Sequence, residues 1–289
     1  MEIQRNQILL IILSGLPLFL GSGFSLLVLD SSVIGNLLGN AQAYSVFELI
    51  IQAVISTAMG TLIVLALFYT IQRRGKTAKR LMIAVVVSPI LYFVSIFLGE
   101  SFLLILFKGS ANLFQGFISI LSLGIAMLSL AMILMDAFPP TLKSVFVAFY
   151  GSIFGIFLGI IMVTSTMFVL IISLILEDYF LTRMSPVVDE VAMSGRVGED
   201  PFDYTRIKSQ SVVVGVGDYV AFSLLSAHSI VYFPLHVSIM SILLALAGVI
   251  VNVLVLAREG KILPGIPLPA LLGIFPWIVH IASLAMFII

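Results

Sequence analysis

Two aspartates stand in segments that are otherwise apolar enough to cross a membrane. Asp178 lies inside the run 175–180, and Asp218 ends the apolar run 211–217. An ionisable side chain at membrane depth costs several kcal/mol, so it indicates a functional site with a partner. We therefore expect Asp178 and Asp218 to face each other, to share a proton and to hydrolyse peptide bonds inside the membrane.

The expected chemistry is that of paired carboxyl groups. Two such groups in near contact cannot both ionise, so one proton is shared between them. Such a pair can deprotonate a water for attack on an amide carbonyl while protonating the carbonyl oxygen. The neighbouring Glu177 is a second acid, but adjacent helix residues point about 100° apart, so only one can face the next span. We choose Asp178 and expect Glu177 to reach toward the cytoplasmic interface.

Two glycines precede Asp218. If the segment is helical, Gly215 lies on the same face as Asp218, so that a neighbouring backbone could approach the carboxyl closely. Gly217 would loosen the helix at the acid and admit substrate or water. The alternative is that both glycines serve only the small-residue packing that is common between membrane helices.

A proline-rich segment opens the last apolar run, with Pro264, Pro267 and Pro269 within six residues. Prolines at this density predict extended backbone over 264–269. Extended backbone near membrane depth needs hydrogen-bond partners, such as an active site or a bound strand. The alternative is a proline-marked helix start.

Composition places the whole chain in a membrane. Of its 289 residues, 61% are hydrophobic and only 10% are charged, whereas soluble domains carry about 25% charged residues. The net charge of zero gives no attraction to nucleic acid. The absence of cysteine excludes disulfides and Cys-based metal sites, and no cofactor or metal is expected. Apolar runs of about 20 residues predict an all-α polytopic protein with nine transmembrane helices: roughly 7–29, 45–71, 80–99, 113–135, 143–162, 165–182, 210–227, 230–256 and 268–289.

Basic residues give the predicted orientation, because Lys and Arg accumulate in cytoplasmic loops. With the N-terminus cytoplasmic and the C-terminus outside, nine spans put 13 of the 14 basic residues inside, and Lys108 alone lies outside. The fifth and sixth spans then require a tight turn near 163–165. One long tilted helix is the alternative, but it would spoil the charge asymmetry.

The predicted organisation is a single integral membrane domain in three parts. Residues 1–182 form a six-helix part that carries Asp178, and residues 210–289 form a three-helix part that carries Asp218. The segment 183–209 joins them as a polar cytoplasmic loop, either a plain connector or a gate that moves to admit substrate.

In combination, these features resemble the presenilin and signal peptide peptidase family of GxGD intramembrane aspartyl proteases. The shared features are an acid on the sixth span, Gly215-Val216-Gly217-Asp218 on the seventh, and Pro269-Ala270-Leu271 opening the ninth. The resemblance implies a compact homologue of prokaryotic type. It also implies that Asp178 and Asp218 are the catalytic pair and that Pro269, Ala270 and Leu271 shape the active site. The family usually has Tyr-Asp on the sixth span, whereas Tyr179 follows the acid here.

The expected partners are therefore transmembrane-helix or signal-peptide substrates and the lipid bilayer, with no nucleic acid and with a homo-oligomer left open. The expected location is the cell membrane if the source is prokaryotic. The main rival is an ion or proton channel or transporter that uses the same paired acids. A prepilin peptidase and an inactive scaffold are further rivals.

Overall fold

The computed structural model describes residues 2–29, 45–107, 115–184, 204–209, 212–256 and 264–288. Over these ranges the protein is helical apart from one short hairpin. Six helical segments are long and apolar enough to cross a membrane, so the predicted all-α membrane class is confirmed. These segments are Arg5–Val28, Arg80–Leu106, Gly116–Leu134, Thr141–Ile161, Leu235–Leu256 and Pro267–Met286.

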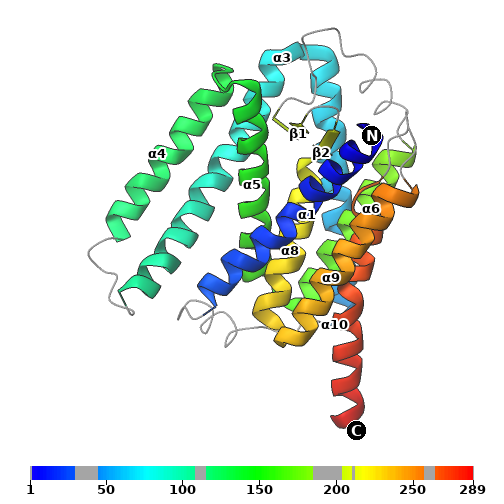
Figure 1. Ribbon diagram of the computed structural model, residues 1–289. Coiled ribbons are helices and arrows are strands. Elements are labelled where there is room, and N and C mark those ends of the chain that lie inside the picture. Colours follow the sequence, from blue (N-terminus) through cyan, green and yellow to red (C-terminus); the bar gives the residue numbers. More distant parts are fainter. Residues whose placement is uncertain are drawn as a thin grey trace.

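The helices pack side by side into a bundle, with the two-stranded hairpin at one end (Figure 1). The antiparallel strands pair Arg206 with Gly215 and Ser209 with Val212. The elements in chain order are α1 (Glu2–Val28), α3 (Val46–Leu106), α4 (Gln115–Leu134), α5 (Pro140–Ile161), α6 (Thr164–Met184), β1 (Arg206–Ser209), β2 (Val212–Gly215), α8 (Val216–Tyr232), α9 (Leu235–Val251), a π-helical turn η1 (Asn252–Leu256), and α10 (Pro267–Ile288).

Helix α3 covers two predicted spans without interruption. Its 61 residues include 45–71 and 80–99 almost completely, so the loop expected between them is wrong. At 1.5 Å per residue α3 measures about 90 Å along its axis, about three times the hydrocarbon thickness. One crossing therefore cannot accommodate it. The helix begins at a capping box in which Ser45 and Glu48 bond each other reciprocally.

The break between the predicted fifth and sixth spans is confirmed. Helix α5 ends at Ile161, Met162 has extended backbone (φ −83°, ψ 137°), and α6 begins at Thr164. The single long helix that was the alternative is therefore wrong. Two separate helices bring α6 back along the bundle toward the hairpin.

Helix α8 is the centre of the bundle. All its residues from Ala221 to Val231 are buried, which is unusual for a helix in a small bundle. It packs between α5 and α1, and both neighbours approach it through glycines. On α5 these are Gly151, Gly155 and Gly159, spaced by four so that they share one face. Small residues let membrane helices come into backbone contact, and α8 is held in this way.

We predict that Gly155→Ala destabilises the bundle. A Cβ at Gly155 would lie 2.1 Å from Ser223 Oγ and 2.3 Å from the Val220 carbonyl oxygen, so α5 and α8 would have to separate. Overpacking of this kind costs about 1–3 kcal/mol. Thermal unfolding in detergent should show a lower melting temperature. The matched control is Gly124→Ala on α4, where a Cβ meets nothing within 4 Å; an equal loss in both variants would contradict this prediction.

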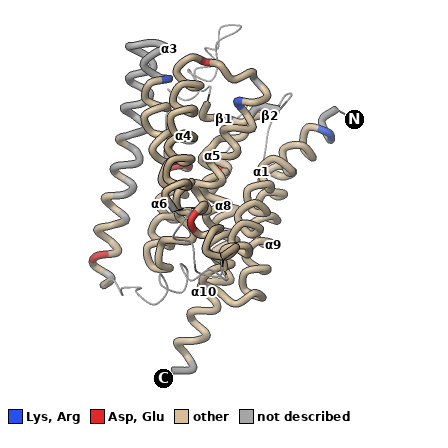
Figure 2. Tube along the Cα trace, turned by 90° about the vertical axis from the view of Figure 1, so that its left-hand side faces the viewer, with Lys and Arg blue, Asp and Glu red and all other residues tan. Residues whose placement is uncertain are grey.

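The basic residues of the described chain lie toward one end of the bundle. In Figure 2 the blue segments are near the N-terminus, near the hairpin and near the upper part of α3, whereas α10 ends at the opposite side. Arg80 and Lys143, both predicted to be cytoplasmic, bind the same carboxylate, that of Asp136. The assignment of this end to the cytoplasm stays a prediction.

Candidate active site

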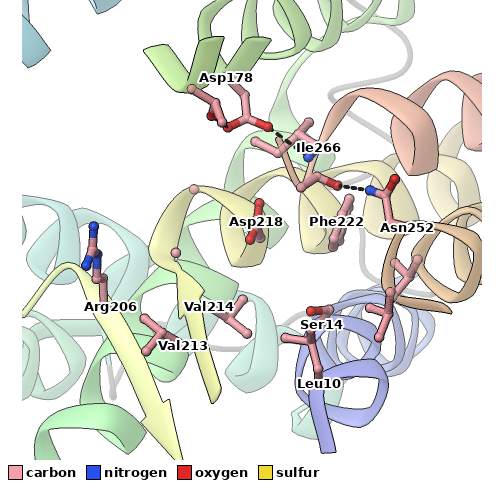
Figure 3. Close-up of a pocket in the computed structure, with 16 residues that line it drawn as sticks. Leu10, Ser14, Asp178, Arg206, Val213, Val214, Asp218, Phe222, Asn252 and Ile266 are labelled. Carbon is pink, nitrogen blue, oxygen red and sulfur yellow. Dashed lines mark hydrogen bonds between the residues drawn. The ribbon is translucent and has the colours of Figure 1, made fainter. Parts of the chain in front are cut away.

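Asp178 and Asp218 line the same cavity, as the sequence predicts. The cavity has a volume of about 550 Å³ and is bounded by α1, α6, the hairpin, α8, the end of α9 and the segment before α10. Asp178, rather than its neighbour Glu177, is the acid of α6 that lines it. Figure 3 shows the two aspartates approaching one space from different helices, with Ile266 beside them.

Asp178 is held by the backbone of the segment that precedes α10. Its Oδ2 accepts a hydrogen bond of 2.9 Å from the Ile266 N–H. Its Oδ1 accepts a longer bond of 3.4 Å from Thr182 Oγ1, one helical turn further along α6. A backbone N–H on one side and a hydroxyl on the other fix the direction in which the carboxyl points.

Asp218 packs against Gly265. A Cβ on Gly265 would lie 2.7 Å from Asp218 Oδ1 and 3.0 Å from Oδ2, so only glycine leaves room for the carboxyl in this position. Gly265 and Ile266 thus contact both aspartates. The α-carbon of Gly265 packs against Asp218, and the N–H of Ile266 donates to Asp178.

Gly215, the first of the two glycines before Asp218, does not lie where we predicted. Gly215 ends β2 in extended backbone (φ −72°, ψ 149°) and α8 begins at Val216, so the expectation of a helical Gly215 on the face of Asp218 is wrong. Cβ atoms at Gly215 and Gly217 would have no neighbour closer than 3.9 Å. Neither glycine is therefore required for helix packing. Both line the cavity and leave open space beside Asp218.

The proline-rich segment becomes helical earlier than predicted. Helix α10 begins at Pro267, so Pro267 and Pro269 occupy its first turn, and extended backbone as far as 269 is wrong. The prolines mark a helix start, because a proline in the first turn gives up no intrahelical hydrogen bond. Gly265 and Ile266 stay outside the helix and reach the aspartates.

Pro269, Ala270 and Leu271 lie within the first five residues of α10, away from the cavity lining. The Pro269 Cα would lie 2.6 Å from a Cβ on Gly248, so α10 and α9 touch through their backbones here. Ala270 is buried, whereas the Leu271 side chain is 51% exposed. Pro269 therefore holds the start of α10 against α9, close in the chain to Gly265 and Ile266. The role of Pro269, Ala270 and Leu271 in shaping the active site stays a prediction.

The hairpin is the main feature that the sequence analysis missed. Residues 206–209 of the expected polar loop form β1, and Val212 to Gly215 form β2 instead of the start of a helix. The Val216 N–H donates to the Thr205 carbonyl oxygen at 3.0 Å, which closes the hairpin directly onto α8. The rest of the loop, residues 185–203, lies outside the described residues, so the structure does not choose between a gate and a plain connector.

A polar cluster anchors the base of this hairpin. Tyr204 donates from its hydroxyl to Asp136 Oδ1 at 2.9 Å, and its carbonyl oxygen accepts a bond of 2.6 Å from the Tyr150 hydroxyl. Asp136 also binds Arg80 and, at 2.6 Å, Lys143. Among the described residues other than glycine, only Asp136 (φ 52°) and Tyr204 (φ 66°) have positive φ. Such backbone persists only where the surroundings enforce it, so the hairpin is held in one position.

The ionisation of Asp136 supports this anchor. Asp136 follows α4 and lies outside the membrane-spanning segments. Burial opposes its charge, but hydrogen bonds from Lys143 and Tyr204 and the charges of Lys143 and Arg80 outweigh burial, so the pKa of Asp136 lies below its usual value. A lowered folded-state pKa stabilises the fold above the unfolded-state value, and this contribution is lost as the pH falls through the folded-state pKa.

We predict that Asp136→Asn lowers stability at neutral pH by about 1 kcal/mol, the size expected for a partly exposed ion pair. The difference from wild type should shrink as the pH falls below about 4, because the wild-type carboxyl is then protonated as well. Thermal unfolding in detergent across this pH range measures both effects. Glu100→Gln on α3, outside this cluster, is the control. A stability difference that does not change with pH would contradict the role of the charge.

His228, although buried, is no part of the cavity. Its Nδ1 is 2.9 Å from the Gly159 carbonyl oxygen and its Nε2 is 3.2 Å from Thr164 Oγ1, so both ring nitrogens have partners. The ring also stacks on Tyr232. Histidine at this position joins α5, α6 and α8 in the core.

Comparison with known proteins identifies no family. The chain matches no protein-family model, and no curated protein matches it. The resemblance to presenilins and signal peptide peptidases therefore stays a prediction from the motifs.

Proposed function

We propose that the protein is an intramembrane aspartyl endopeptidase that cuts transmembrane helices or remnant signal peptides. One observation carries the proposal: aspartates from two separate helices, Asp178 on α6 and Asp218 on α8, line one cavity of a membrane protein. The proposal includes membership of the presenilin and signal peptide peptidase family.

The proposed reaction needs only the two carboxyls and a water. One carboxyl group takes a proton from the water while the water oxygen bonds to the amide carbon, and the other protonates the carbonyl oxygen. The tetrahedral intermediate then loses the amine, which takes a proton, and a carboxylic acid remains. A proton shared between Asp178 and Asp218 suits both steps, and the pair is treated as one titrating unit.

The substrate must unwind before it is cut, because a helix hides its amides in its own hydrogen bonds. The cavity offers extended backbone at β2, where Val213, Val214 and Gly215 line it. An unwound stretch of substrate would pair along β2, a main-chain mode of recognition that tolerates many sequences. The segment that begins at Pro267 offers no such strand edge, because it is helical.

The proposed topology is nine crossings with the N-terminus in the cytoplasm and the C-terminus outside, in the cell membrane if the source is prokaryotic. Support comes from the length of α3, which suffices for two crossings. If α3 crosses the membrane twice and each of the other seven α-helices of the described chain crosses once, the total is nine crossings. The basic residues at the hairpin end agree with this orientation.

The deciding experiment compares proteolysis with ion transport. Purified protein in detergent is incubated with a transmembrane peptide that carries a fluorescent label at each end, and fragments are identified by mass spectrometry. The same protein in liposomes is assayed for proton and cation flux. Peptide fragments support the protease. Flux that depends on the aspartates, without any fragment, would replace it with a channel or transporter.

A further inference from the structure

The peptide group between Gly265 and Ile266 connects Asp178 to Asn252, a residue outside the motifs of the sequence. The Ile266 N–H donates to Asp178 Oδ2, and the carbonyl of the same peptide group, that of Gly265, accepts a hydrogen bond of 3.1 Å from Asn252 Nδ2. Figure 3 shows both bonds in line, with Asn252 at one end and Asp178 at the other. Asn252, this peptide and Asp178 therefore form one chain of hydrogen bonds.

The orientation of the Gly265–Ile266 peptide decides whether the Asp178 carboxyl faces a hydrogen-bond donor or an acceptor. As it stands, an N–H donor faces the carboxyl. A flipped peptide would turn the Gly265 carbonyl oxygen toward the carboxyl, and two acceptors would then oppose each other. Gly265 makes such a flip easier than any other residue would, because glycine has the widest choice of backbone angles. A bond to the carbonyl from the opposite side resists the flip.

The position of Asn252 suits this task. It lies where α9 ends and the π-helical turn η1 begins, a distortion that is frequent at functional sites because it redirects side chains. Its side chain is only 7% exposed, and it lines the cavity with the aspartates. A bond to the carbonyl also polarises the peptide, which strengthens the N–H bond to Asp178.

We propose that Asn252 is a positioning residue that locks the Gly265–Ile266 peptide so that its N–H points at Asp178. This inference rests on the proposed function, since it assigns Asn252 to the orientation of one member of the catalytic pair. Asn252 touches no reacting atom and acts through the peptide alone. Its side-chain amide, rather than its size, is what the site requires.

The test uses substitutions at Asn252 in the full chain. Asn252→Leu and Asn252→Asp keep the size of the side chain but remove the N–H donor, whereas Asn252→Gln keeps an amide and has the cavity to extend into. The matched control is Ser241→Ala. Ser241 Oγ on α9 donates to the Gly273 carbonyl oxygen of α10 at 2.6 Å, a side-chain-to-carbonyl bond of the same kind that lies away from the cavity.

Two readouts are measured on each variant. The first is kcat and KM for the labelled transmembrane peptide. The second is hydrogen–deuterium exchange over 264–267, where the prolines carry no amide hydrogen, so that uptake reports Gly265 and Ile266 alone. For the loss of one hydrogen bond we expect kcat to fall about tenfold and exchange to rise about tenfold in Asn252→Leu and Asn252→Asp, with KM changed less than about threefold.

Asn252→Gln should keep wild-type exchange and most of the activity. Ser241→Ala should lower the melting temperature while leaving kcat and exchange unchanged. Unchanged exchange in Asn252→Leu, or an equal loss of kcat in Ser241→Ala, would overturn the role of Asn252. If Asn252→Leu does not fold, the test is the difference in kcat and exchange between Asn252→Asp, which lacks the N–H donor, and Asn252→Gln, which keeps it. If the wild type cuts no peptide, the proposed function fails. Hydrogen–deuterium exchange in the variants then still tests whether Asn252 fixes the Gly265–Ile266 peptide.

Discussion

Asp218→Asn and Asp178→Asn should each abolish peptide cleavage. Asparagine has nearly the shape of aspartate, but it can neither take a proton from water nor donate one to a carbonyl oxygen. Proton transfer of this kind contributes about 10²–10⁴-fold to catalysis, so we expect each variant to lose at least about 10³-fold in kcat. The measurement is the rate of fragment formation from the labelled transmembrane peptide.

The matched control is Glu177→Gln, which removes the adjacent acid of α6. Glu177 is partly buried beside Asp178 but does not line the cavity. Cleavage by Glu177→Gln should stay within about threefold of wild type, because a residue outside the reacting group takes no part in proton transfer. Thermal unfolding of all three variants shows whether they fold. Cleavage that survives in both folded aspartate variants would remove the catalytic pair from the proposal.

The common cavity of Asp178 and Asp218 could be predicted from sequence because the membrane makes charge informative. In a soluble protein Asp178 and Asp218 would be two acids among many. In a chain with 10% charged residues, two acids inside apolar runs are exceptional, and their common cavity follows from the antiparallel return of neighbouring spans. The same reasoning could not choose between Asp178 and Glu177 on physical grounds alone, because one residue of helix register decides the outcome.

Hydropathy does not distinguish strand β2 from the helix that follows it. Val212, Val213 and Val214 are as apolar as the helix that follows them, so a search for membrane spans absorbs them into α8. Periodicity cannot separate a short apolar strand from a buried helix. β-branched side chains do favour strands, and three successive valines after a polar turn were the signal that could have indicated a hairpin.

Charge gives the opposite error at α3. Because the basic residues at 73–80 cannot lie in lipid, the sequence predicts separate spans on either side of them, whereas α3 runs through them without interruption. Arg, Lys and Ala are nevertheless good helix formers, and outside the hydrocarbon nothing prevents a helix from continuing through them. Hydropathy therefore locates where a chain leaves the membrane, whereas helix ends depend on caps and breakers.

The peptide between the aspartates was beyond sequence analysis. Asn252 and Gly265 are 13 residues apart, and their bond depends on how α9 ends and how α10 begins. The sequence predicts extended backbone over 264–269, whereas in the structure Gly265 and Ile266 of this segment contact the aspartates. Gly265 and Ile266 act through an α-carbon and an N–H, which no residue pattern specifies.

Gly265→Ala is expected to have the second-largest effect of the variants considered. Gly265 does not adopt a left-handed φ, so alanine can take up its backbone conformation, and only the added Cβ matters. This Cβ would lie 2.7 Å from Asp218 Oδ1 and 3.1 Å from Asp218 Cγ, so either the carboxyl or the peptide bound to Asp178 must move. A displacement approaching 1 Å at a reacting group lowers the rate by about 10²-fold, and we expect a loss of kcat of this order.

Gly23→Ala on α1 is the matched control, because a Cβ there meets nothing within 4 Å and the residue lies outside the cavity lining. It should cleave peptide at the wild-type rate. Gly265→Ala should remain folded, since the cavity gives the displaced carboxyl room, and its loss should appear in kcat more than in KM. If Gly265→Ala cleaves as fast as wild type, the contact between Gly265 and Asp218 does not set the position of the carboxyl during the reaction. The aspartates would then have to meet in an arrangement in which Gly265 has moved away from Asp218.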